Sequence, residues 1–144
     1  MKKMCLGILS IVFLLIGCSI TPVETVPYLI SGDFEMETDS EDYSVCGIDL
    51  LLLNQSAKDI NEFSIVFYLF DKDGEPAKEC SNRISFDIEK TIDAGDSFKQ
   101  CLSLDKYMYM LPEDLLFVDY LYVSRIVYSD GSVWEDPYGL FVFR

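Results

Sequence analysis

The sequence contains no histidine, and this absence limits the chemistry that the protein could perform. Histidine is the commonest general base, a common zinc and copper ligand and the usual pH-sensitive side chain. Catalysis by a serine–histidine or cysteine–histidine pair is therefore excluded. An enzyme would have to rely on carboxylates such as Asp71 and Asp73, which lie in a single turn with no evident catalytic partner. We therefore expect a protein that is not an enzyme and needs no cofactor.

Positive charge is also scarce. The chain has 11 lysine and arginine residues against 25 aspartate and glutamate residues, which gives a net charge of −14. A polyanion of this size is repelled by nucleic acid and by anionic lipid head groups, so nucleic-acid binding is excluded. The same charge favours solubility, cationic partners or divalent metal ions.

Long apolar runs are few, and one of them lies at the start of the chain. Lys2 and Lys3 precede an apolar stretch from Met4 to Ile16. A charged start followed by about 7–15 apolar residues is typical of a secretory signal peptide. A helix that spans a bilayer needs about 20 apolar residues, so this stretch is too short to cross comfortably. We predict that residues 1–17 are a signal peptide.

The apolar stretch ends in Leu15-Ile16-Gly17-Cys18, which resembles the lipobox of bacterial lipoproteins at all four positions. The resemblance implies that Cys18 receives a diacylglyceryl group and that a dedicated peptidase cuts before it. The new amino terminus is often acylated as well, for instance with palmitate. Each buried CH₂ group contributes about 0.8 kcal/mol, and lasting attachment needs more than one acyl chain. The alternatives are a plain apolar anchor and an ordinary signal peptide with an incidental cysteine.

Removal of residues 1–17 leaves 127 residues, with 9 basic and 25 acidic side chains and a net charge of −16. This length suits one domain. Residues 18–29 contain Pro22 and Pro27 and little hydrophobic periodicity, so we expect a lipidated tether of roughly 30 Å when extended. Residues 30–144 form the expected domain. In some Gram-negative bacteria, an aspartate directly after the lipidated cysteine retains lipoproteins at the inner membrane. This chain has Ser19 at that position, so the resemblance favours the outer membrane, on its periplasmic or surface face.

Three cysteines follow the lipobox: Cys46, Cys80 and Cys101. An exported protein can form disulfides, but an odd number leaves at least one thiol without a partner in the chain. Any of the three pairings remains open. Strand alternation places Cys101 opposite to Phe98 and Leu102, so we expect it to point outward. A buried, unreactive role is the favoured alternative to a disulfide.

Two acidic segments suggest a calcium site. Six of the ten residues from Asp33 to Asp42 are acidic, and clustered carboxylates suit hard cations. Their alternation with Phe34 and Met36 instead favours a solvated edge strand, whose charges discourage edge-to-edge pairing. The segment 71–75 is similar to the opening of a calcium loop, but the later ligands of an EF-hand are missing, and a glycine-containing turn explains it better.

Alternating apolar residues and turn signals predict an all-β protein. The signals favour a single antiparallel β-sandwich of immunoglobulin-like type with about seven strands, and an open barrel is the competing architecture. A short helical turn is expected at 111–114. The expected strands cover residues 33–36, 43–54, 63–70, 84–88, 98–104, 120–128 and 133 onward, with 140–143 closing the chain.

The segment Phe67-Tyr68-Leu69-Phe70-Asp71 resembles the Phe-x-Leu-Tyr-Asp family of small β-sandwich domains found in exported bacterial proteins. Phe70 replaces the family's tyrosine. Gly47 and Asn54 upstream, and the turn at 92–95, are also similar to that family, over about residues 45–104. The resemblance implies a sandwich fold in an envelope protein and brings no catalytic residues.

Aromatic residues are concentrated late in the chain, where six of the nine tyrosines lie beyond residue 106. By strand alternation, Tyr120, Tyr122 and Tyr128 share one face, and Arg125 lies on the other. One hypothesis is a surface that binds a partner, because tyrosine, tryptophan and arginine are enriched where partners are gripped. Its candidate residues are Tyr107, Tyr109, Tyr122, Arg125 and Trp134. The alternative is that one aromatic face is core.

These observations favour a membrane-anchored envelope lipoprotein that presents a non-catalytic immunoglobulin-like domain for contact with another protein or for envelope organisation. Its oligomeric state is open. The alternative function is a lipoprotein that binds a small ligand or calcium through the acidic strand or a pocket in the sandwich.

Overall fold

The computed structural model describes residues 25–37 and 39–141. The signal segment, the lipobox with Cys18 and most of the expected tether lie outside the described residues. The described part is all-β, as predicted, and forms seven strands: β1 (Tyr28–Glu35), β2 (Gly47–Asn54), β3 (Ile60–Phe70), β4 (Arg83–Ile92), β5 (Ser97–Ser103), β6 (Phe117–Tyr128) and β7 (Val133–Glu135).

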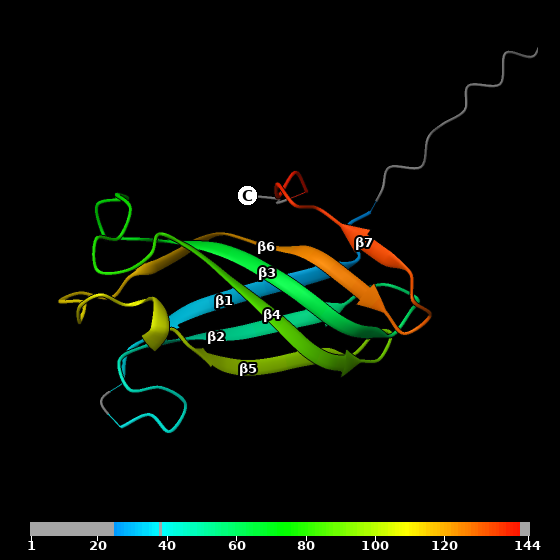
Figure 1. Ribbon diagram of the computed structural model, residues 1–144, viewed down its shortest axis with the longest axis horizontal. Coiled ribbons are helices and arrows are strands. Elements are labelled where there is room, and N and C mark those ends of the chain that lie inside the picture. The colour runs from blue at the N-terminus through cyan, green and yellow to red at the C-terminus, as the bar shows by residue number, and fades with distance from the viewer. Residues whose placement is uncertain (1–24, 38, 142–144) are drawn as a thin grey trace, which may run out of the picture.

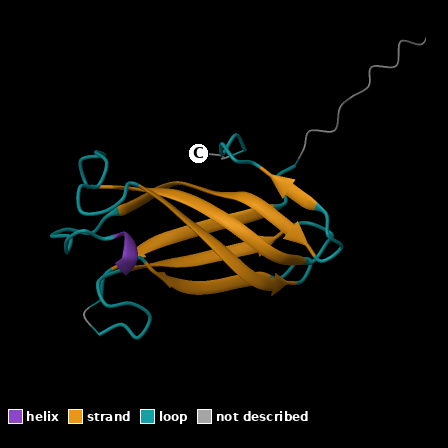
Figure 2. Ribbon diagram, viewed as in Figure 1, coloured by secondary structure: helices purple, strands orange, loops and turns teal. Residues whose placement is uncertain are grey.

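The strands form two antiparallel sheets that pack face to face (Figures 1 and 2). One sheet has the order β1-β2-β5, and the other has the order β4-β3-β6-β7. Every pair of neighbours is antiparallel. This arrangement confirms the predicted immunoglobulin-like sandwich, in which β4 belongs to the sheet of β3 and β6. No helix within the described residues is long and apolar enough to cross a membrane.

The core lies between the sheets, where alternate residues of each strand point inward. Phe63, Ile65, Phe67 and Leu69 of β3 are fully buried. Phe63 meets Phe98 of β5 edge to face, with ring centroids 5.6 Å apart. Buried residues at alternate positions along β3 are expected of a strand that faces the core on one side.

The outer face of β3 is covered as well, but by side chains of the same sheet and not by a third layer. Val66 points away from the core and is still only 2% exposed. Its cross-strand partner is Tyr122 of β6, which is itself 5% exposed. Val66 is therefore buried on the outer face by Tyr122 of the neighbouring strand.

Strand β6 departs from simple alternation, because its pairing with β3 shifts register in three places. Val123 pairs with Ile65 and Ile126 pairs with Phe63, so inward positions are separated by three residues and not by two. The shift places Tyr128 in the core and Arg125 on the outer face. The prediction that Tyr128 shares a face with Tyr122 was therefore wrong, and so was the side assigned to Arg125.

Local boundaries also differ from the prediction. The described 3₁₀ turn spans Asp105–Tyr107 and not 111–114. The described part of the expected closing strand, Leu140 and Phe141, is a turn. Strand β1 begins at Tyr28, two residues inside the range expected for the tether.

The loops gather at the two ends of the sandwich. Near the start of β1, the buried side chain of Asn54 joins two turns: its Nδ2 donates to the carbonyl oxygens of Lys58, Ile92 and Asp93 at 2.8, 3.1 and 3.1 Å. Its Oδ1 accepts from the backbone N–H and the hydroxyl of Ser56.

At the opposite end, the carboxylate of Asp105 holds the loop between β1 and β2. It accepts hydrogen bonds from the backbone N–H groups of Ser44, Val45 and Cys46. Burial alone raises the pKa of Asp105, but these bonds favour the charged form and the net shift is downward.

Candidate functional site

Two of the predicted partner-binding residues lie close together: Tyr107 ends the 3₁₀ turn, and Tyr109 follows it two residues later. Tyr107 packs on Phe86 with ring centroids 5.4 Å apart, and its hydroxyl donates to the carbonyl oxygen of Ser85. Tyr109, in contrast, is 72% exposed. Its backbone N–H donates to the carbonyl oxygen of Glu79, 2.7 Å away, so the exposed ring stands on a fixed main chain.

Arg125 and Trp134 lie elsewhere, on neighbouring strands. Arg125 forms ion pairs with Glu62 at 3.1 Å and with Glu135 at 3.7 Å on the outer face. Trp134 packs edge to face on the buried ring of Tyr28, with centroids 5.6 Å apart. The five predicted residues therefore do not form one continuous surface.

Tyr122 is buried because the segment after β7 folds back over β6. Asp136 is 2% exposed, and its carboxylate accepts hydrogen bonds from the backbone N–H groups of Leu140 at 2.8 Å and Phe141 at 3.0 Å. Gly139 has a φ of +64°, and a Cβ there would lie 3.0 Å from the ring of Tyr122. Only glycine allows the chain to approach the ring this closely.

All three cysteines of the domain are free thiols. Cys46 and Cys80 are buried, and burial raises the pKa of Cys46 to about 12 and that of Cys80 to about 11. Cys101 is half-buried on the outer face, as expected from strand alternation. Burial also raises its pKa, and nearby carboxylates add to the shift.

The acidic segments do not form a metal site among the described residues, where no cluster of three or more suitable ligands occurs. Phe34 and Met36 pack against the core while Asp33 of the edge strand is exposed. The carboxylate of Asp71 is used within its own turn, where Oδ1 accepts from the backbone N–H groups of Asp73 and Glu75, both at 2.9 Å. Its pKa is lowered chiefly by the bond from Glu75.

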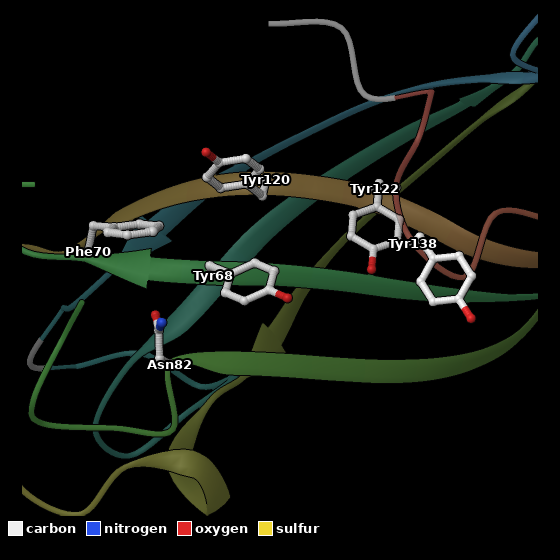
Figure 3. A pocket seen from close by; sticks show the side chains of 7 residues that line it. Tyr68, Phe70, Asn82, Tyr120, Tyr122 and Tyr138 are labelled. Atoms are coloured by element: carbon white, nitrogen blue, oxygen red, sulfur yellow. The ribbon is translucent and has the colours of Figure 1, made fainter. Parts of the chain in front are cut away.

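A pocket of about 380 Å³ opens on the outer face of the four-stranded sheet. Figure 3 shows its aromatic side chains along β3 and β6, with Asn82 beside the first residue of β4. Four tyrosines contribute to the lining, together with a phenylalanine, an asparagine and a glycine: Tyr68, Tyr120, Tyr122, Tyr138, Phe70, Asn82 and Gly139. The pocket therefore joins the middle of the sheet, the start of β4 and the folded-back C-terminal segment.

The rings of the pocket are fixed by contacts with one another. Tyr68 meets Tyr120 edge to face with centroids 5.9 Å apart, and Phe70 lies 6.4 Å from Tyr120. Tyr120 has a φ of +50°, the one non-glycine residue of the described chain with positive φ. A bulky residue in this region stores conformational strain, and such strain is common at binding sites.

The amide of Asn82 is the polar group of the pocket that is incompletely satisfied. Its Oδ1 is inaccessible to solvent and accepts no hydrogen bond from the described residues. The backbone carbonyl of Asn82 accepts from the N–H of Leu69 at 3.2 Å, which fixes the residue at the edge of β3. A buried acceptor without a donor is unfavourable and calls for an explanation.

A second surface feature is the loop that leads into β6. The loop and the first residue of β6 carry large apolar side chains that are all more than half exposed, and we refer to them as the apolar tip: Tyr109, Met110, Leu111, Leu115 and Phe117. Pro112 and Leu116 in the same loop are buried, so the loop is attached to the domain on one side. Figure 1 places this loop at the end of the sandwich opposite the start of β1.

Of the five predicted partner-binding residues, Tyr109 belongs to the apolar tip and Tyr122 lines the pocket. Tyr68 and Phe70 were noticed as part of a family motif and not as a surface. Their alternation with buried Phe67 and Leu69 was the available signal that they point outward together.

No family model matches the chain, and no curated protein matches it in sequence. A solved structure, that of a hypothetical protein from Peptoclostridium difficile 630, has the same fold with a TM-score of 0.58. The alignment covers 78% of this chain and 88% of that chain at 13% identity. A likeness at this identity shows a shared fold and leaves function to be argued from the site.

Proposed function

We propose that the chain is a bacterial envelope lipoprotein, held in the outer membrane by lipid on Cys18, whose domain makes a non-catalytic contact with another protein. The charged start, the apolar stretch and the lipobox support the anchor. The observation that supports the contact most directly is the apolar tip, because contiguous exposed apolar side chains mark interaction sites.

The position of the apolar tip fits this proposal. Tyr28 pairs with Asn54 at one end of the sandwich, and the backbone N–H of Gln55 donates to the carbonyl oxygen of Pro27 there. Strand β1 begins at this end, and the apolar tip lies at the opposite end of the sandwich (Figure 1). A partner could then reach the tip without competing with the membrane.

The main chain of the apolar tip is held in place before any partner binds. The backbone N–H groups of Tyr109 and Met110 both donate to the carbonyl oxygen of Glu79, at 2.7 and 3.3 Å. A preorganised loop loses less conformational entropy on binding than a free one. The surrounding domain is strongly acidic, so we expect the partner to carry a basic rim around an apolar centre.

The contact is tested by photo-crosslinking in intact cells. A photoreactive amino acid replaces Leu111 at the apolar tip or, as a matched control, Leu51, which is exposed on the outer face of β2. We expect a discrete crosslinked protein from position 111 and none from position 51. Crosslinks of equal yield from both positions, or none from position 111, would contradict the contact.

The anchor is tested separately. Metabolic labelling with an alkyne fatty acid should modify the wild-type chain and not Cys18→Ser, and the variant should leave the membrane fraction. Labelling of the variant would refute the assignment of Cys18. Protease digestion of intact cells, with a known periplasmic protein as the leakage control, distinguishes the two faces of the outer membrane.

A further inference from the structure

The two buried cysteines, Cys46 and Cys80, are attached to the two ends of one short segment that contains the 3₁₀ turn. The carbonyl oxygen of Cys46 accepts a hydrogen bond from the backbone N–H of Leu104 at 3.0 Å, just before the turn. Cys80 forms an isolated β-bridge with Met108, just after the turn. A 3₁₀ turn rises only about 2.0 Å per residue, so this segment brings the two cysteines to the same end of the sandwich.

Both side chains point into the core between the sheets, where Cys46 is 0% exposed and Cys80 is 4% exposed. Cys46 directly precedes β2 of one sheet, and Cys80 lies shortly before β4 of the other. Burial is the first cause of the raised pKa of Cys46, followed by the charges of Asp105 and of Cys80. The two thiols are therefore close enough to interact electrostatically. A bond between them would join the two sheets covalently.

The third cysteine of the domain, Cys101, lies on the opposite side of its sheet. Its Sγ would be 2.8 Å from a Cβ placed on Gly47, so it lies over the backbone of that glycine. Gly47 directly follows Cys46, and consecutive residues of an extended chain point to opposite faces. The thiol of Cys46 therefore faces the core while that of Cys101 faces outward. Of the three pairings that the sequence left open, the fold favours Cys46 with Cys80.

We propose that Cys46 and Cys80 form a disulfide in the exported protein, and that this bond fixes the base of the apolar tip to the three-stranded sheet. The oxidant is a protein disulfide of the thiol–disulfide oxidoreductase class, which exported chains meet in oxidising compartments. In cells the supply of this oxidant rests on the export proposed above. The choice of the pair rests on the fold alone.

The bond forms in two exchange steps. The thiolate of one cysteine attacks the disulfide of the oxidant, which gives a mixed disulfide and releases one thiolate of the oxidant. The thiolate of the other cysteine then attacks the mixed disulfide, so that Sγ of Cys46 bonds to Sγ of Cys80 and the second thiolate of the oxidant leaves. Two electrons pass from the cysteines to the oxidant, and the two thiol protons end on its two sulfur atoms.

Burial determines when these steps can occur. In the folded chain the pKa of Cys46 is raised to about 12 and that of Cys80 to about 11, so few thiolates exist near neutral pH. Both side chains are also enclosed by the core, where a protein oxidant does not reach them. We therefore expect the bond to form during folding, before the sheets close over the thiols. The closed domain then shields the bond from reduction.

The position of Cys80 connects the bond to the apolar tip. Cys80 directly follows Glu79, whose carbonyl oxygen accepts hydrogen bonds from the backbone N–H groups of Tyr109 and Met110. When Cys80 is bonded to Cys46, this contact is fixed to the start of β2. The bond also closes a loop that contains β2 and β3, one strand from each sheet. Closure of a loop of this size should raise the melting temperature by about 10 °C.

The test uses the full-length chain, purified from membranes in detergent. The chain is unfolded in urea with dithiothreitol and is then refolded in a mixture of reduced and oxidised glutathione. Mass spectrometry of a digest made without reduction should show the peptide of Cys46 linked to that of Cys80, with the loss of two hydrogen atoms. No link, or a link from Cys101 to either cysteine in most chains, would overturn the proposal. The same digest shows whether Cys18 carries lipid, so a failure of the proposed anchor is seen separately.

Melting curves compare the oxidised and the reduced wild type, which have the same side chains. We expect the oxidised form to melt about 10 °C higher. The matched control Cys101→Ser should form the same link and gain as much, whereas Cys80→Ala should gain nothing from oxidising conditions. An oxidised wild type that melts below the reduced form would show that the bond strains the native fold, and would overturn the proposal.

Hydrogen exchange tests the effect on the apolar tip. The amides of Tyr109 and Met110 should exchange more slowly in the oxidised wild type than in the reduced form, because the residue that binds them is fixed by its neighbour. The amide of Gly95, which donates to Asn54 at the other end of the sandwich, should change less and serves as the control. Equal exchange of Tyr109 and Met110 in the two forms would refute the effect on the tip.

Discussion

The buried side chain of Asn54 should be the most sensitive polar position of the domain. Its amide connects the end of β2 to the turn that follows it and to the turn between β4 and β5, as described above. The backbone takes part as well, because the N–H of Asn54 donates to Asp96 and its carbonyl accepts from Gly95. The side chain therefore joins the turn directly after β2 to the turn between β4 and β5, which is distant in sequence.

Asn54→Ala removes these side-chain hydrogen bonds and leaves the carbonyl of Ile92 buried without its partner. A buried acceptor that loses its donor costs about 1–3 kcal/mol, and each partly buried bond contributes about 0.5–1.5 kcal/mol. Water can replace the bonds to Ser56 at the surface. We therefore expect the free energy of unfolding to fall by about 3 kcal/mol. Asn54→Asp should cost at least as much, because it turns a carboxylate oxygen towards carbonyl oxygens.

Urea denaturation followed by circular dichroism measures this effect. With a slope of about 1.5 kcal/mol per molar urea, a loss of about 3 kcal/mol lowers the midpoint by about 2 M. The matched control is Asn61→Ala, an exposed asparagine in β3, which should stay within about 0.5 kcal/mol of the wild type. A change below about 1 kcal/mol in Asn54→Ala, at unchanged slope, would refute the argument that this network joins the turns.

Three further outcomes are expected. Tyr120→Gly should be more stable than Tyr120→Ala by about 1 kcal/mol in the same denaturation assay. Both variants lose the ring, but glycine adopts a φ of +50° without the strain that alanine has there. Equal stabilities would show that the backbone at this position is not strained. The pKa of Asp105 is lowered in the folded state, so its stabilising effect is present above the unfolded value of about 3.9 and is lost as the pH falls through the folded value. Asp105→Asn should therefore flatten the acid limb of stability against pH, and an unchanged limb would contradict this. At pH 8, iodoacetamide should modify Cys101 before Cys46 and Cys80, because burial raises the pKa values of Cys46 and Cys80 to about 12 and about 11. Mass spectrometry measures the modification rates, and equal rates for the three cysteines in the folded chain would contradict this expectation.

The sequence predicted the sandwich well because several strands place core residues at alternate positions over most of their length. Strands β3 and β4 illustrate this, with Phe63, Phe67 and Ile84 all fully buried at alternating positions. Strand β6 could not be predicted in the same way. Its register shifts depend on pairing with β3 and leave no trace in the alternation of β6 itself.

The pocket was missed for a related reason. Tyr68, Tyr120 and Tyr138 come from separate segments, and only the bulged register of β6 and the fold-back of the C-terminal segment bring them together. This segment is also joined to β6 by the backbone N–H of Asp136, which donates to the carbonyl oxygen of Ser124. Contacts of this kind are tertiary, so a pattern along one strand does not contain them.

The placement of β1 also has a mechanical consequence. The strand enters at the end opposite the apolar tip and is joined to β2 along eight register pairs, from Tyr28–Asn54 to Glu35–Gly47. A force that pulls the segment before Tyr28 away from the apolar tip acts along the strand axis, because β1 runs from one end of the sandwich to the other (Figure 1). The ladder is then loaded in shear, with its hydrogen bonds strained together, and does not open one bond at a time like a zipper. A domain held at these two points should resist stretching more strongly than one pulled from both ends of a single hairpin.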